Sequence, residues 1–301
     1  MIKELTVLGT VYVDIKGYPL GNFVPTGRNV GCVAQFHGGV GRNIAEDVAN
    51  LGEPAALLAL VDKGGIGADV VKHLAERKVN TSFMQATEDG MGTWLAIFDE
   101  QGDVCANISK RPNLLPLCDI LEAKGEEIFA QSRALLLEID IDEPIVAAAM
   151  KLAEAKNVPV YGVISNINIA MERMAYIRKL QCFTCNRQEA AVLFGMDFEK
   201  ELQGKTVAEM EALVGGKRQE LQLQRLVVTL DAEGSVYASA EGTGFCPAQK
   251  TQVVDTTGAG DSFFAGVSIG LSKGAGLQEA CELGTKMAAK VVSVAENVYL
   301  P

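Results

Sequence analysis

Short apolar runs alternate with segments of helical spacing along most of this chain of 301 residues. In the runs, aliphatic residues follow one another largely without polar interruption, as they do in buried parallel strands. In the segments between them, an apolar residue recurs every three or four positions, which is typical of helices packed on a sheet. The pattern predicts strands at residues 5–8, 55–61, 133–138, 158–164, 182–185, 226–230 and 235–240, and helices at 67–78, 143–156, 171–180, 187–194 and 207–222. This alternation favours an α/β fold with a central, mostly parallel sheet flanked by helices.

Two stretches, residues 11–37 and 90–110, interrupt this alternation. They carry glycine, asparagine and short β-branched pieces in place of helical spacing, and residues 93–98 with 103–108 predict a β-hairpin. We expect both stretches to form a small β lid over a binding site. No repeat or low-complexity linker divides the chain, so residues 1–301 are expected to form a single domain. The exposed strand face of the lid could pair with a second copy, which would give a homodimer.

The charge balance narrows the range of partners. The formal net charge is −11, and Lys and Arg do not gather into a basic patch, which argues against nucleic acid or an anionic membrane surface as a partner. The N-terminus leads directly into the first strand without a signal-peptide pattern, and no apolar run reaches the length of a membrane span. We therefore expect a cytoplasmic protein whose partner is a small molecule.

The seven cysteines form an odd and scattered set. Cys182 and Cys185 make a single CxxC, but a zinc site would need a second pair or nearby histidines, and the chain has only 2 histidines. The pair falls within a predicted strand and not at a helix start, which disfavours a thioredoxin-like motif. Buried, inert thiols are the favoured interpretation, with a redox or metal role as the alternative.

The most informative stretch is Asp255–Gly266, with the sequence DTTGAGDSFFAG. We expect it to follow a strand that ends at 251–254 and to open a buried helix, a geometry that turns free backbone N–H groups towards an anion. Gly258 and Gly260 allow the main chain to approach a phosphate closely. Asp261 lies where the anion would bind. This position suggests a general base that acts on a hydroxyl, and a simple N-cap is the alternative.

A second glycine cluster, Gly38–Asn43 with the sequence GGVGRN, begins another predicted helix. It does not complete the dinucleotide fingerprint GxGxxG, because residue 44 is isoleucine. Arg42 and Asn43 at a helix start favour a polyhydroxy ligand, since an amide offers both a donor and an acceptor to vicinal hydroxyls. A tight turn with a capping asparagine is the alternative. Asp14 follows the first strand, at the sheet edge where open α/β folds bind ligands, and there the alternative is a surface turn.

Two weaker sites also follow predicted strands. Asn186 and Glu189 open a helix, where the carboxylate could hold Mg²⁺ through water, and the alternative is an ordinary helix start. Thr229 and Gly234 flank a strand–turn–strand that could contact nucleotide phosphates, and the alternative is a purely structural turn. Neither site is specific by itself.

Taken together, Gly38–Asn43 and Asp255–Asp261 resemble the two signatures of the PfkB, or ribokinase-like, carbohydrate kinase family, in order and in separation. The resemblance extends over essentially the whole chain. It implies a ribokinase-like α/β fold and phosphoryl transfer from ATP with Mg²⁺, and in some relatives K⁺. By position it implies Asp261 as the base, with the anion hole formed by Gly258, Ala259 and Gly260. It implies that the substrate is bound by Asp14, Gly38, Gly39, Arg42 and Asn43, and that ATP lies along Asn186, Thr229, Gly234 and Asn297. It also implies that Glu189 holds Mg²⁺ and that Asp255 and Thr257 bind a monovalent cation.

The acceptor is harder to predict than the reaction. Gly38–Asn43, with Arg42 after the glycines, is similar to the form in bacterial pseudouridine kinases, so the resemblance favours the 5′-hydroxyl of pseudouridine. Kinases of a free sugar such as ribose or fructose, a catalytically silent sugar- or nucleotide-binding regulator, and a dinucleotide oxidoreductase are the alternatives. Lys110 and Arg111 follow the hairpin and could meet an acidic sugar, although a solvated turn is favoured. Asp231 departs from the family pattern, which usually has glycine there.

Overall fold

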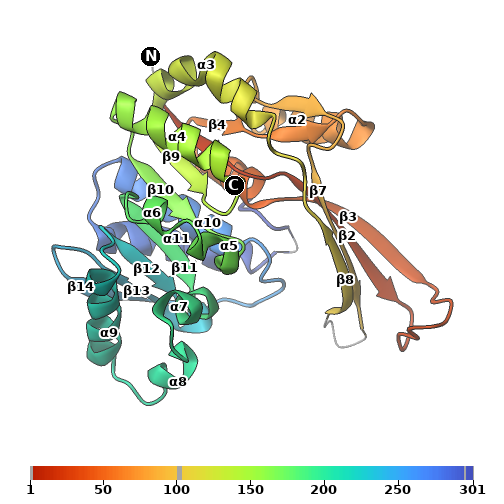
Figure 1. Cartoon of the computed structure of the whole chain (residues 1–301). Helices are drawn as coiled ribbons and strands as arrows, with labels where there is room; N and C mark the ends of the chain where they lie inside the picture. Colours follow the sequence, from red (N-terminus) through yellow and green to blue (C-terminus); the bar gives the residue numbers. More distant parts are fainter. Residues whose placement is uncertain (1–2, 100–103, 295, 301) are drawn as a thin grey trace.

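The computed structural model describes residues 3–99, 104–294 and 296–300 (Figure 1). An 8-stranded sheet forms its centre, in the order β14-β13-β12-β11-β10-β9-β1-β4. Its strands are β1 (Glu4–Leu8), β4 (Ala55–Leu58), β9 (Ser132–Glu138), β10 (Val160–Val163), β11 (Cys182–Asn186), β12 (Leu226–Thr229), β13 (Gly234–Ala238) and β14 (Thr243–Pro247). The neighbouring pairs from β4 to β12 are parallel, whereas β13 and β14 join antiparallel. The prediction of an α/β fold with a mostly parallel sheet is confirmed.

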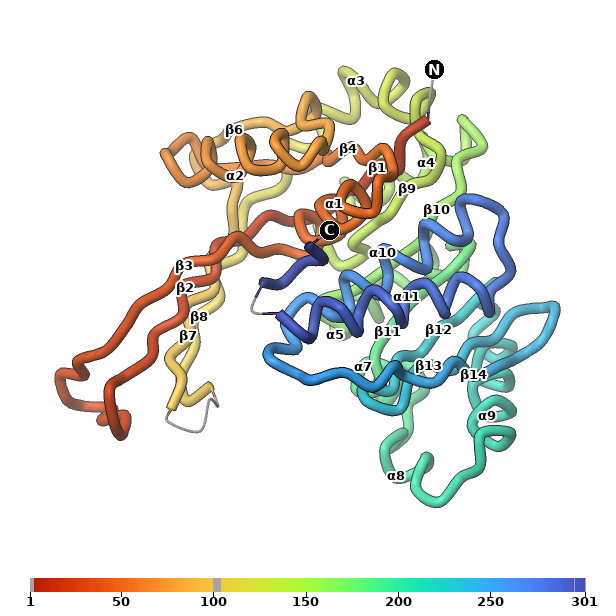
Figure 2. The backbone as a smooth tube through the Cα atoms, turned by 180° about the vertical axis from the view of Figure 1, so that it is seen from behind, coloured from red at the N-terminus to blue at the C-terminus, as the bar shows by residue number. Residues whose placement is uncertain are grey.

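Helices cover both faces of this sheet. They are α1 (Val40–Asn50), α2 (Gly65–Glu76), α3 (Leu117–Gln131), α4 (Glu143–Lys156), α5 (Ile167–Met171), α6 (Met174–Ile177), α7 (Arg187–Phe194), α8 (Phe198–Leu202), α9 (Val207–Glu220), α10 (Ala259–Ser272) and α11 (Leu277–Val291), with a 3₁₀ turn η1 (Asp231–Glu233). Figure 1 shows α3, α4 and α6 in front of the sheet, and Figure 2 shows α1, α10 and α11 in front of its other face. Leu135 and Leu137 of β9 pack in the core under α3 and α4, whereas Ala134 and Leu136 pack in the core under α1 and α10. Alternate residues of one strand therefore supply both cores.

A second, 4-stranded sheet in the order β3-β2-β7-β8 projects from one end of the body (Figures 1 and 2). Its strands are β2 (Tyr12–Pro19), β3 (Gly31–Gly38), β7 (Gly92–Phe98) and β8 (Val104–Lys110). β7 and β8 pair antiparallel, as a hairpin requires, and the connection at 100–103 lies outside the described residues. Because β2 follows β1 and β3 leads into α1, this sheet is joined to the end of the body where the two glycine clusters lie. Its role as a lid stays a prediction.

Some elements differ from those predicted. The run expected as one strand at 55–61 divides into β4 and β5 (Leu60–Asp62), and β5 pairs with β6 (Gln85–Thr87) in a separate 2-stranded sheet. The helix expected at 171–180 is replaced by the short α5 and α6. Helix α3, which was not predicted, buries Leu117, Leu121 and Ile128, so helical spacing was available there as a signal.

Residues 251–254, expected as a strand end, form an exposed loop. This loop precedes the turn at Gly258, Ala259 and Gly260, the glycine corner from which α10 begins. Val253 and Val254 are 61% and 58% exposed. The Val254 N–H donates to Val292 O at 2.7 Å, just beyond α11, and so contributes no ladder bond to the sheet. β-branched residues fit well into a sheet, but a segment rich in them forms a strand only where a neighbouring strand is available for pairing. In the described part of the chain, no helix is long and apolar enough to span a membrane.

Candidate functional site

A cavity of about 430 Å³ opens where the 4-stranded sheet meets the body. Side chains from the turn after β1, from β2, β7 and β8, from the end of β9 and from the start of α10 line it. The lining residues are Thr10, Tyr12, Asp14, Gly39, Val40, Asn43, Trp94, Ser109, Arg111, Glu138, Asp140, Ser165, Asn166, Thr257, Gly258 and Asp261. Six of the residues predicted from the two glycine motifs and the first strand therefore meet in one place, although Asn43 and Asp261 are 218 positions apart.

The corner before α10 has the geometry of an anion site. Gly258 is the N-cap with a φ of 79°, a conformation that residues with a Cβ rarely adopt, and a Cβ there would overlap the backbone oxygen of Asn297. Among the described residues, no backbone hydrogen bond uses the N–H of Gly258 or Gly260. The Ala259 N–H, by contrast, donates to Thr256 O at 3.3 Å, a long and weak bond. The corner therefore presents two free amides and one weakly engaged amide, where the sequence predicts three.

Asp261 lies in the first turn of α10 and lines the cavity. Its Oδ2 accepts a 2.8 Å hydrogen bond from Asn43 Nδ2. Burial raises the pKa of the Asp261 carboxyl to about 6, while the hydrogen bond from Asn43 and the charge of Arg42 oppose that rise. The carboxylate is therefore ionised at neutral pH and still able to accept a proton, which is the property that a general base needs.

Arg42 does not line the cavity, and its contact with the substrate stays a prediction. Its buried guanidinium donates through Nη1 to Asn43 Oδ1 at 2.9 Å and to His37 O at 3.1 Å, and Nη2 pairs with Glu46 Oε2 at 2.6 Å. Because the donor from Arg42 occupies Asn43 Oδ1, the NH₂ group of Asn43 is the end that faces Asp261. Arg42 thus orients the asparagine that holds the candidate base.

Asp14 and Gly39 also line the cavity, and Gly38 lies directly behind Asp14. The Asp14 carboxylate lies over Gly38 so closely that a Cβ at Gly38 would overlap it. Gly39 is the N-cap of α1 with a φ of 98°. Burial raises the pKa of the Asp14 carboxyl, and the charges of Lys16 and Arg42 oppose that rise. A carboxylate beside an amide and glycine main chain is a set of groups that can bind several hydroxyls of one ligand.

Two acidic residues that the sequence analysis did not single out, Glu138 and Asp140, also line the cavity. Glu138 Oε2 accepts from Thr10 N at 2.7 Å and from Thr10 Oγ1 at 2.9 Å. Asp140 accepts from Ser165 N at 3.0 Å and from Ser165 Oγ at 2.8 Å. Burial and then the charge of Asp140 raise the pKa of Glu138 to about 8. A signal was present in the sequence, because both acids stand at the end of a predicted strand, where open α/β sheets bind ligands.

Asn186 and Glu189 form a reciprocal capping box at the start of α7. Asn186 Oδ1 accepts from the Glu189 N–H at 2.8 Å, and Glu189 Oε2 accepts from the Asn186 N–H at 2.7 Å. Burial, joined by the charges of Asp140 and Asp261 and opposed by the Asn186 N–H, raises the pKa of Glu189 to about 7. The described residues contain no group of three His, Cys, Asp or Glu side chains placed to chelate a metal directly. This donor set fits Mg²⁺ held through its own water, since Mg²⁺ keeps much of its hydration shell.

Thr229 ends β12 and Gly234 begins β13, and neither lines the cavity. A Cβ on Gly234 would overlap the backbone oxygen of Cys246 across the β13–β14 pair, so the strand pairing itself requires glycine here. Asp231 has a φ of 51°, a conformation that glycine favours and aspartate tolerates, and its Oδ2 lies 3.1 Å from Arg187 Nε. The turn thus accommodates aspartate in place of glycine, and its contact with a nucleotide stays a prediction.

Asn297 lies behind the corner and not in the cavity. Its Oδ1 accepts from Arg42 Nη1 at 3.1 Å, and its Nδ2 donates to His37 O at 2.9 Å. Two residues further on, the Tyr299 N–H donates to the buried Asp47 Oδ1 at 2.6 Å. The C-terminal segment therefore fastens to α1 and supports Gly258 from behind. Contact of Asn297 with adenine stays a prediction.

Asp255 and Thr257, the predicted cation residues, form a closed turn. Asp255 Oδ1 accepts from Thr257 N at 2.8 Å and from Thr257 Oγ1 at 2.7 Å. Asp255 Oδ2 faces Lys16 Nζ at 3.4 Å. Lys16 projects from β2, is 6% exposed, and lies 5.1 Å and 6.0 Å from the ring centroids of Phe36 and Phe98. The 4-stranded sheet is thus tied to the corner by an ammonium group that neutralises Asp255.

Cys182 and Cys185 lie three positions apart in β11, which places them on opposite faces of the sheet. Cys182 packs in the core under α1 and α10, and Cys185 packs in the core under α3 and α4. Burial raises the pKa of the Cys182 thiol to about 12 and raises that of Cys185 well above its usual range. The two thiols are therefore inert and cannot act as a pair.

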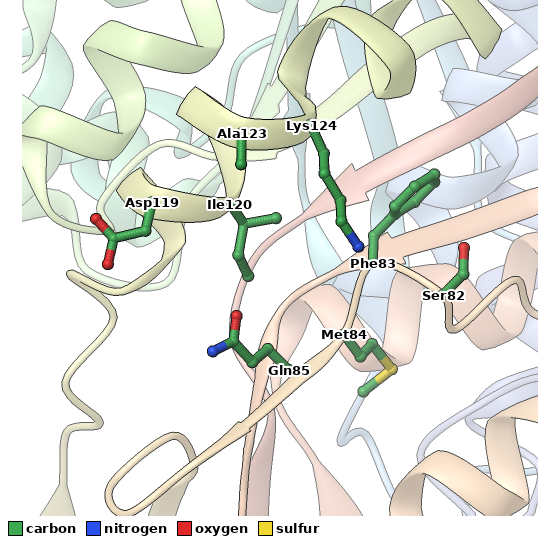
Figure 3. Close-up of a pocket in the computed structure, with 8 residues that line it drawn as sticks. All are labelled: Ser82, Phe83, Met84, Gln85, Asp119, Ile120, Ala123 and Lys124. Carbon is green, nitrogen blue, oxygen red and sulfur yellow. The ribbon is translucent and has the colours of Figure 1, made fainter.

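A second hollow of about 370 Å³ lies between the start of α3 and the segment that leads into β6 (Figure 3). Figure 3 shows residues 82–85 on one side and Asp119, Ile120, Ala123 and Lys124 from α3 on the other. None of the predicted site residues lines this hollow. The candidate site is therefore the cavity beneath the 4-stranded sheet.

Comparison with known proteins gives consistent relatives over nearly the whole chain. The chain is 30% identical over 303 residues to guanosine-inosine kinase of Exiguobacterium acetylicum, a match that covers 100% of this chain and 98% of the relative. It is 26% identical over 266 residues to pseudouridine kinase of Escherichia coli (strain K12), covering 88% of this chain and 82% of that protein.

The fold also has close structural counterparts. Arabidopsis thaliana ribokinase, solved in complex with ribose and ATP, matches with a TM-score of 0.83 and 20% sequence identity, covering 98% of this chain and 94% of the ribokinase. This likeness confirms the predicted ribokinase-like fold. The model for pfkB family carbohydrate kinases matches residues 2–298. The chain therefore belongs to the pfkB family of carbohydrate kinases and is a phosphotransferase with an alcohol group as acceptor.

Proposed function

We propose that this chain is an ATP-dependent kinase that phosphorylates the 5′-hydroxyl of a ribonucleoside. One observation carries the proposal: the 2.8 Å hydrogen bond from Asn43 holds Asp261, a base of pKa about 6, inside the cavity. Asp14 and Gly39, which we propose to bind sugar hydroxyls, line the same cavity as Asp261, and so does Gly258 of the corner with the free amides. This arrangement supports transfer of a phosphoryl group to a hydroxyl of a sugar ring.

In the proposed reaction, Asp14, Gly39 and Asn43 hold the ring hydroxyls, so that the primary hydroxyl points at Asp261. Asp261 accepts the hydroxyl proton late, because phosphoryl transfer is loose and gains more from positioning than from a strong nucleophile. The amides of Gly258 and Gly260 donate to the equatorial oxygens of the migrating group and stabilise the charge that develops there.

On the nucleotide side, Asn186, Thr229 and Gly234 are proposed to lie along ATP. Mg²⁺, when bound, would neutralise charge on the phosphates, and Glu189 would accept hydrogen bonds from its water ligands. Closure of the 4-stranded sheet over the cavity would exclude water and so limit wasteful hydrolysis of ATP.

The choice of a nucleoside rests on the relatives together with the cavity. Guanosine-inosine kinase and pseudouridine kinase, at 30% and 26% identity, are both named for nucleosides. Pseudouridine is the acceptor favoured by the GGVGRN cluster, and guanosine and inosine are favoured by the relative with the higher identity. Free ribose or fructose, and a catalytically silent regulator of the same fold, are the alternatives.

The test is ADP release from ATP and Mg²⁺ across pseudouridine, guanosine, inosine, ribose and fructose, with the wild type beside Asp261→Asn. We expect the substitution to lower kcat by about 10²–10⁴-fold and to leave the Kd for ATP nearly unchanged. Asp119→Asn, which changes a carboxylate in the second hollow, is the matched control and should keep full turnover. An active Asp261→Asn variant would remove Asp261 from the base role, and binding without turnover of any acceptor would favour the regulator.

Potassium dependence at Asp255 and Thr257 stays a prediction. Because the ammonium group of Lys16 already faces the Asp255 carboxylate at 3.4 Å, K⁺ would have to compete with it for that oxygen. Turnover measured in sodium and in potassium salts at equal ionic strength tests this requirement. Equal rates in the two salts would show that the turn works without added K⁺.

A homodimer through the 4-stranded sheet is also proposed. Leu95 and Ile108 are cross-strand partners and share with Val33 the face opposite to Asp14, and these three side chains are 38%, 67% and 75% exposed. An apolar strand face that remains exposed is a natural surface for association. Light scattering of the wild type and of Ile108→Glu tests the proposal: a dimer that becomes a monomer supports it, and a monomeric wild type contradicts it.

A further inference from the structure

A row of side chains crosses the inner face of the 4-stranded sheet. Asp14 of β2 is the register partner of Trp94 in β7, and Trp94 is the partner of Ser109 in β8. All three line the cavity. Because neighbouring strands lie about 4.8 Å apart, Ser109 is about 10 Å from Asp14 along this row. A ligand whose sugar hydroxyls bind at Asp14 can therefore extend under Trp94 to Ser109, which is farther than a pentose ring reaches.

Trp94 offers a flat apolar surface in the middle of this row. Its indole packs edge-on against Phe98, with ring centroids 6.3 Å apart and an interplanar angle of 90°, which restrains its orientation. Stacking on an indole suits any planar base and offers little to a free sugar. Trp94 is also the single tryptophan of the chain, so its fluorescence reports on this part of the cavity alone.

Arg111 follows β8 and supplies a positive charge at the far end of the row. Its Nη2 donates to Asp140 O at 3.1 Å, which fixes the guanidinium between the 4-stranded sheet and the end of β9. The side chains of Tyr12, Ser109 and Asn166 also line the cavity, and the Tyr12 hydroxyl lies beside Ser109. These groups give this part of the cavity several hydrogen-bond donors, which lie beside the acidic residues at the end of β9.

The donors of Arg111 distinguish between bases. The planar fork of a guanidinium matches two neighbouring acceptors, and the O6 and N7 atoms of a 6-oxopurine are such a pair. Adenine carries an amino donor in place of O6, so that a donor would face a donor. In the uracil ring of pseudouridine an N–H separates the two carbonyl groups, so no edge presents two neighbouring acceptors. Free ribose carries no base that the guanidinium could bind.

We propose that this cavity selects 6-oxopurine ribonucleosides, with the base stacked on Trp94 and its O6 and N7 atoms bound by the guanidinium of Arg111. The inference rests on the proposed function, because it takes the ribose to lie at Asp14 with its 5′-hydroxyl at Asp261. It goes further by naming the class of base and the two side chains that recognise it. Lys110, the other cation of this segment, pairs with Asp89 at the surface and has no part in the selection.

The binding test is titration of Trp94 fluorescence with inosine, guanosine, adenosine, pseudouridine and ribose, without ATP. Inosine and guanosine should change the emission and bind about 5- to 100-fold more tightly than adenosine or pseudouridine, since a bidentate contact to a base discriminates by about that factor. Ribose should leave the emission unchanged. Equal affinity for adenosine, tighter binding of pseudouridine, or an equal response to ribose would overturn the proposal.

Two substitutions test whether Arg111 is the residue that selects the base. Arg111→Lys keeps the charge and loses the fork, so it should weaken binding of inosine and guanosine by about 5- to 100-fold and erase the preference over adenosine. Lys110→Met loses a charge at the neighbouring position and is the matched control, which should bind as the wild type does. An Arg111→Lys variant that keeps the preference would overturn the role of Arg111.

Failure of this inference can be told apart from failure of the kinase proposal. A selective response of Trp94 to 6-oxopurine nucleosides without phosphorylation of any acceptor would leave the base site standing and remove the kinase. Rapid phosphorylation of ribose, without preference for inosine, would leave the kinase standing and remove the base site.

Discussion

Substitution of Arg42 by methionine tests whether a buried ion pair orients Asn43, the asparagine that bonds the candidate base Asp261. The Arg42 side chain is 4% exposed and that of Glu46 is 1% exposed, with 2.6 Å between Nη2 and Oε2. The same guanidinium donates to Asn43 Oδ1 at 2.9 Å. Arg42→Met therefore removes two things at once: the main counter-charge of Glu46 and the contact that fixes the amide of Asn43.

Loss of the counter-charge of Glu46 should lower the stability of the fold, whereas loss of the contact to Asn43 should lower turnover. Removing one partner of a buried pair costs about 3–5 kcal/mol. Arg77 Nε at 3.7 Å keeps a positive charge beside Glu46, and His73 Nε2 at 2.9 Å keeps a hydrogen-bond partner, so we expect the lower end of that range. For a chain of 301 residues, ~3 kcal/mol lowers Tm by roughly 5 °C. A misplaced Asn43 amide should lower kcat by about 100-fold, because errors of about 1 Å at a reacting group cost that much.

The double variant Arg42→Met/Glu46→Gln separates folding from orientation. Neutralising Glu46 removes the unpaired buried charge and should restore most of the Tm, measured by circular dichroism. It does not restore the donor to Asn43 Oδ1, so turnover measured by ADP release should stay about 100-fold low at a temperature where the variant is folded. If the double variant regained turnover together with stability, Arg42 would act through folding alone and the orientation argument would be refuted.

The remaining predictions concern protons and the tether to the 4-stranded sheet. Because the ionised form of Asp261 accepts the proton and its pKa is about 6, kcat should fall roughly tenfold per pH unit below pH 6, and a flat profile between pH 4.5 and 8 would contradict its role. Burial raises the folded-state pKa of Asp47 to about 8 from its ordinary value of 3.8, so the folded state keeps a proton that the unfolded state releases, and stability falls as the pH rises between these values. Asp47→Asn should remove that fall, so its Tm relative to wild type should rise between pH 4 and pH 8. Lys16→Met cuts the tether to Asp255 and should raise the KM for the acceptor several-fold with little change in the KM for ATP, as measured by steady-state kinetics.

The sequence was sufficient to predict which motifs meet, because their residue types are dictated by backbone geometry. Gly258 and Gly39 have φ values of 79° and 98°, which residues with a Cβ rarely adopt. Because such positions usually require glycine, they can be recognised in the sequence. Asp14 and Asp261 stand at the ends of elements whose order predicts a common edge. Asp231 shows the limit of this argument, because aspartate adopts the positive φ that the family usually gives to glycine.

The direction of long side chains was the part that could not be predicted. Arg42 begins the same helix as Asn43, and its reach allowed it to point either into the cavity or behind it. Glu46 lies one helical turn further on and pairs with the guanidinium away from the cavity, so the i, i+4 spacing was the available clue. Lys16 likewise reaches Asp255 across 239 positions, a contact that no local pattern encodes.

The excess of carboxylates connects these observations. The acids that line the cavity are Asp14, Glu138, Asp140 and Asp261. Their repulsion reaches Glu189, whose pKa of about 7 is partly due to two of them. At neutral pH the repulsion between these carboxylates decreases when one of them binds a proton or when a cation binds among them. These carboxylates would repel a polyanionic phosphate donor unless positive charge accompanied it, so we expect the nucleotide to bind together with a metal ion and not alone. Arg111, whose Nη2 donates to Asp140 O, places one positive charge beside these acids, next to the position that we propose for the uncharged base.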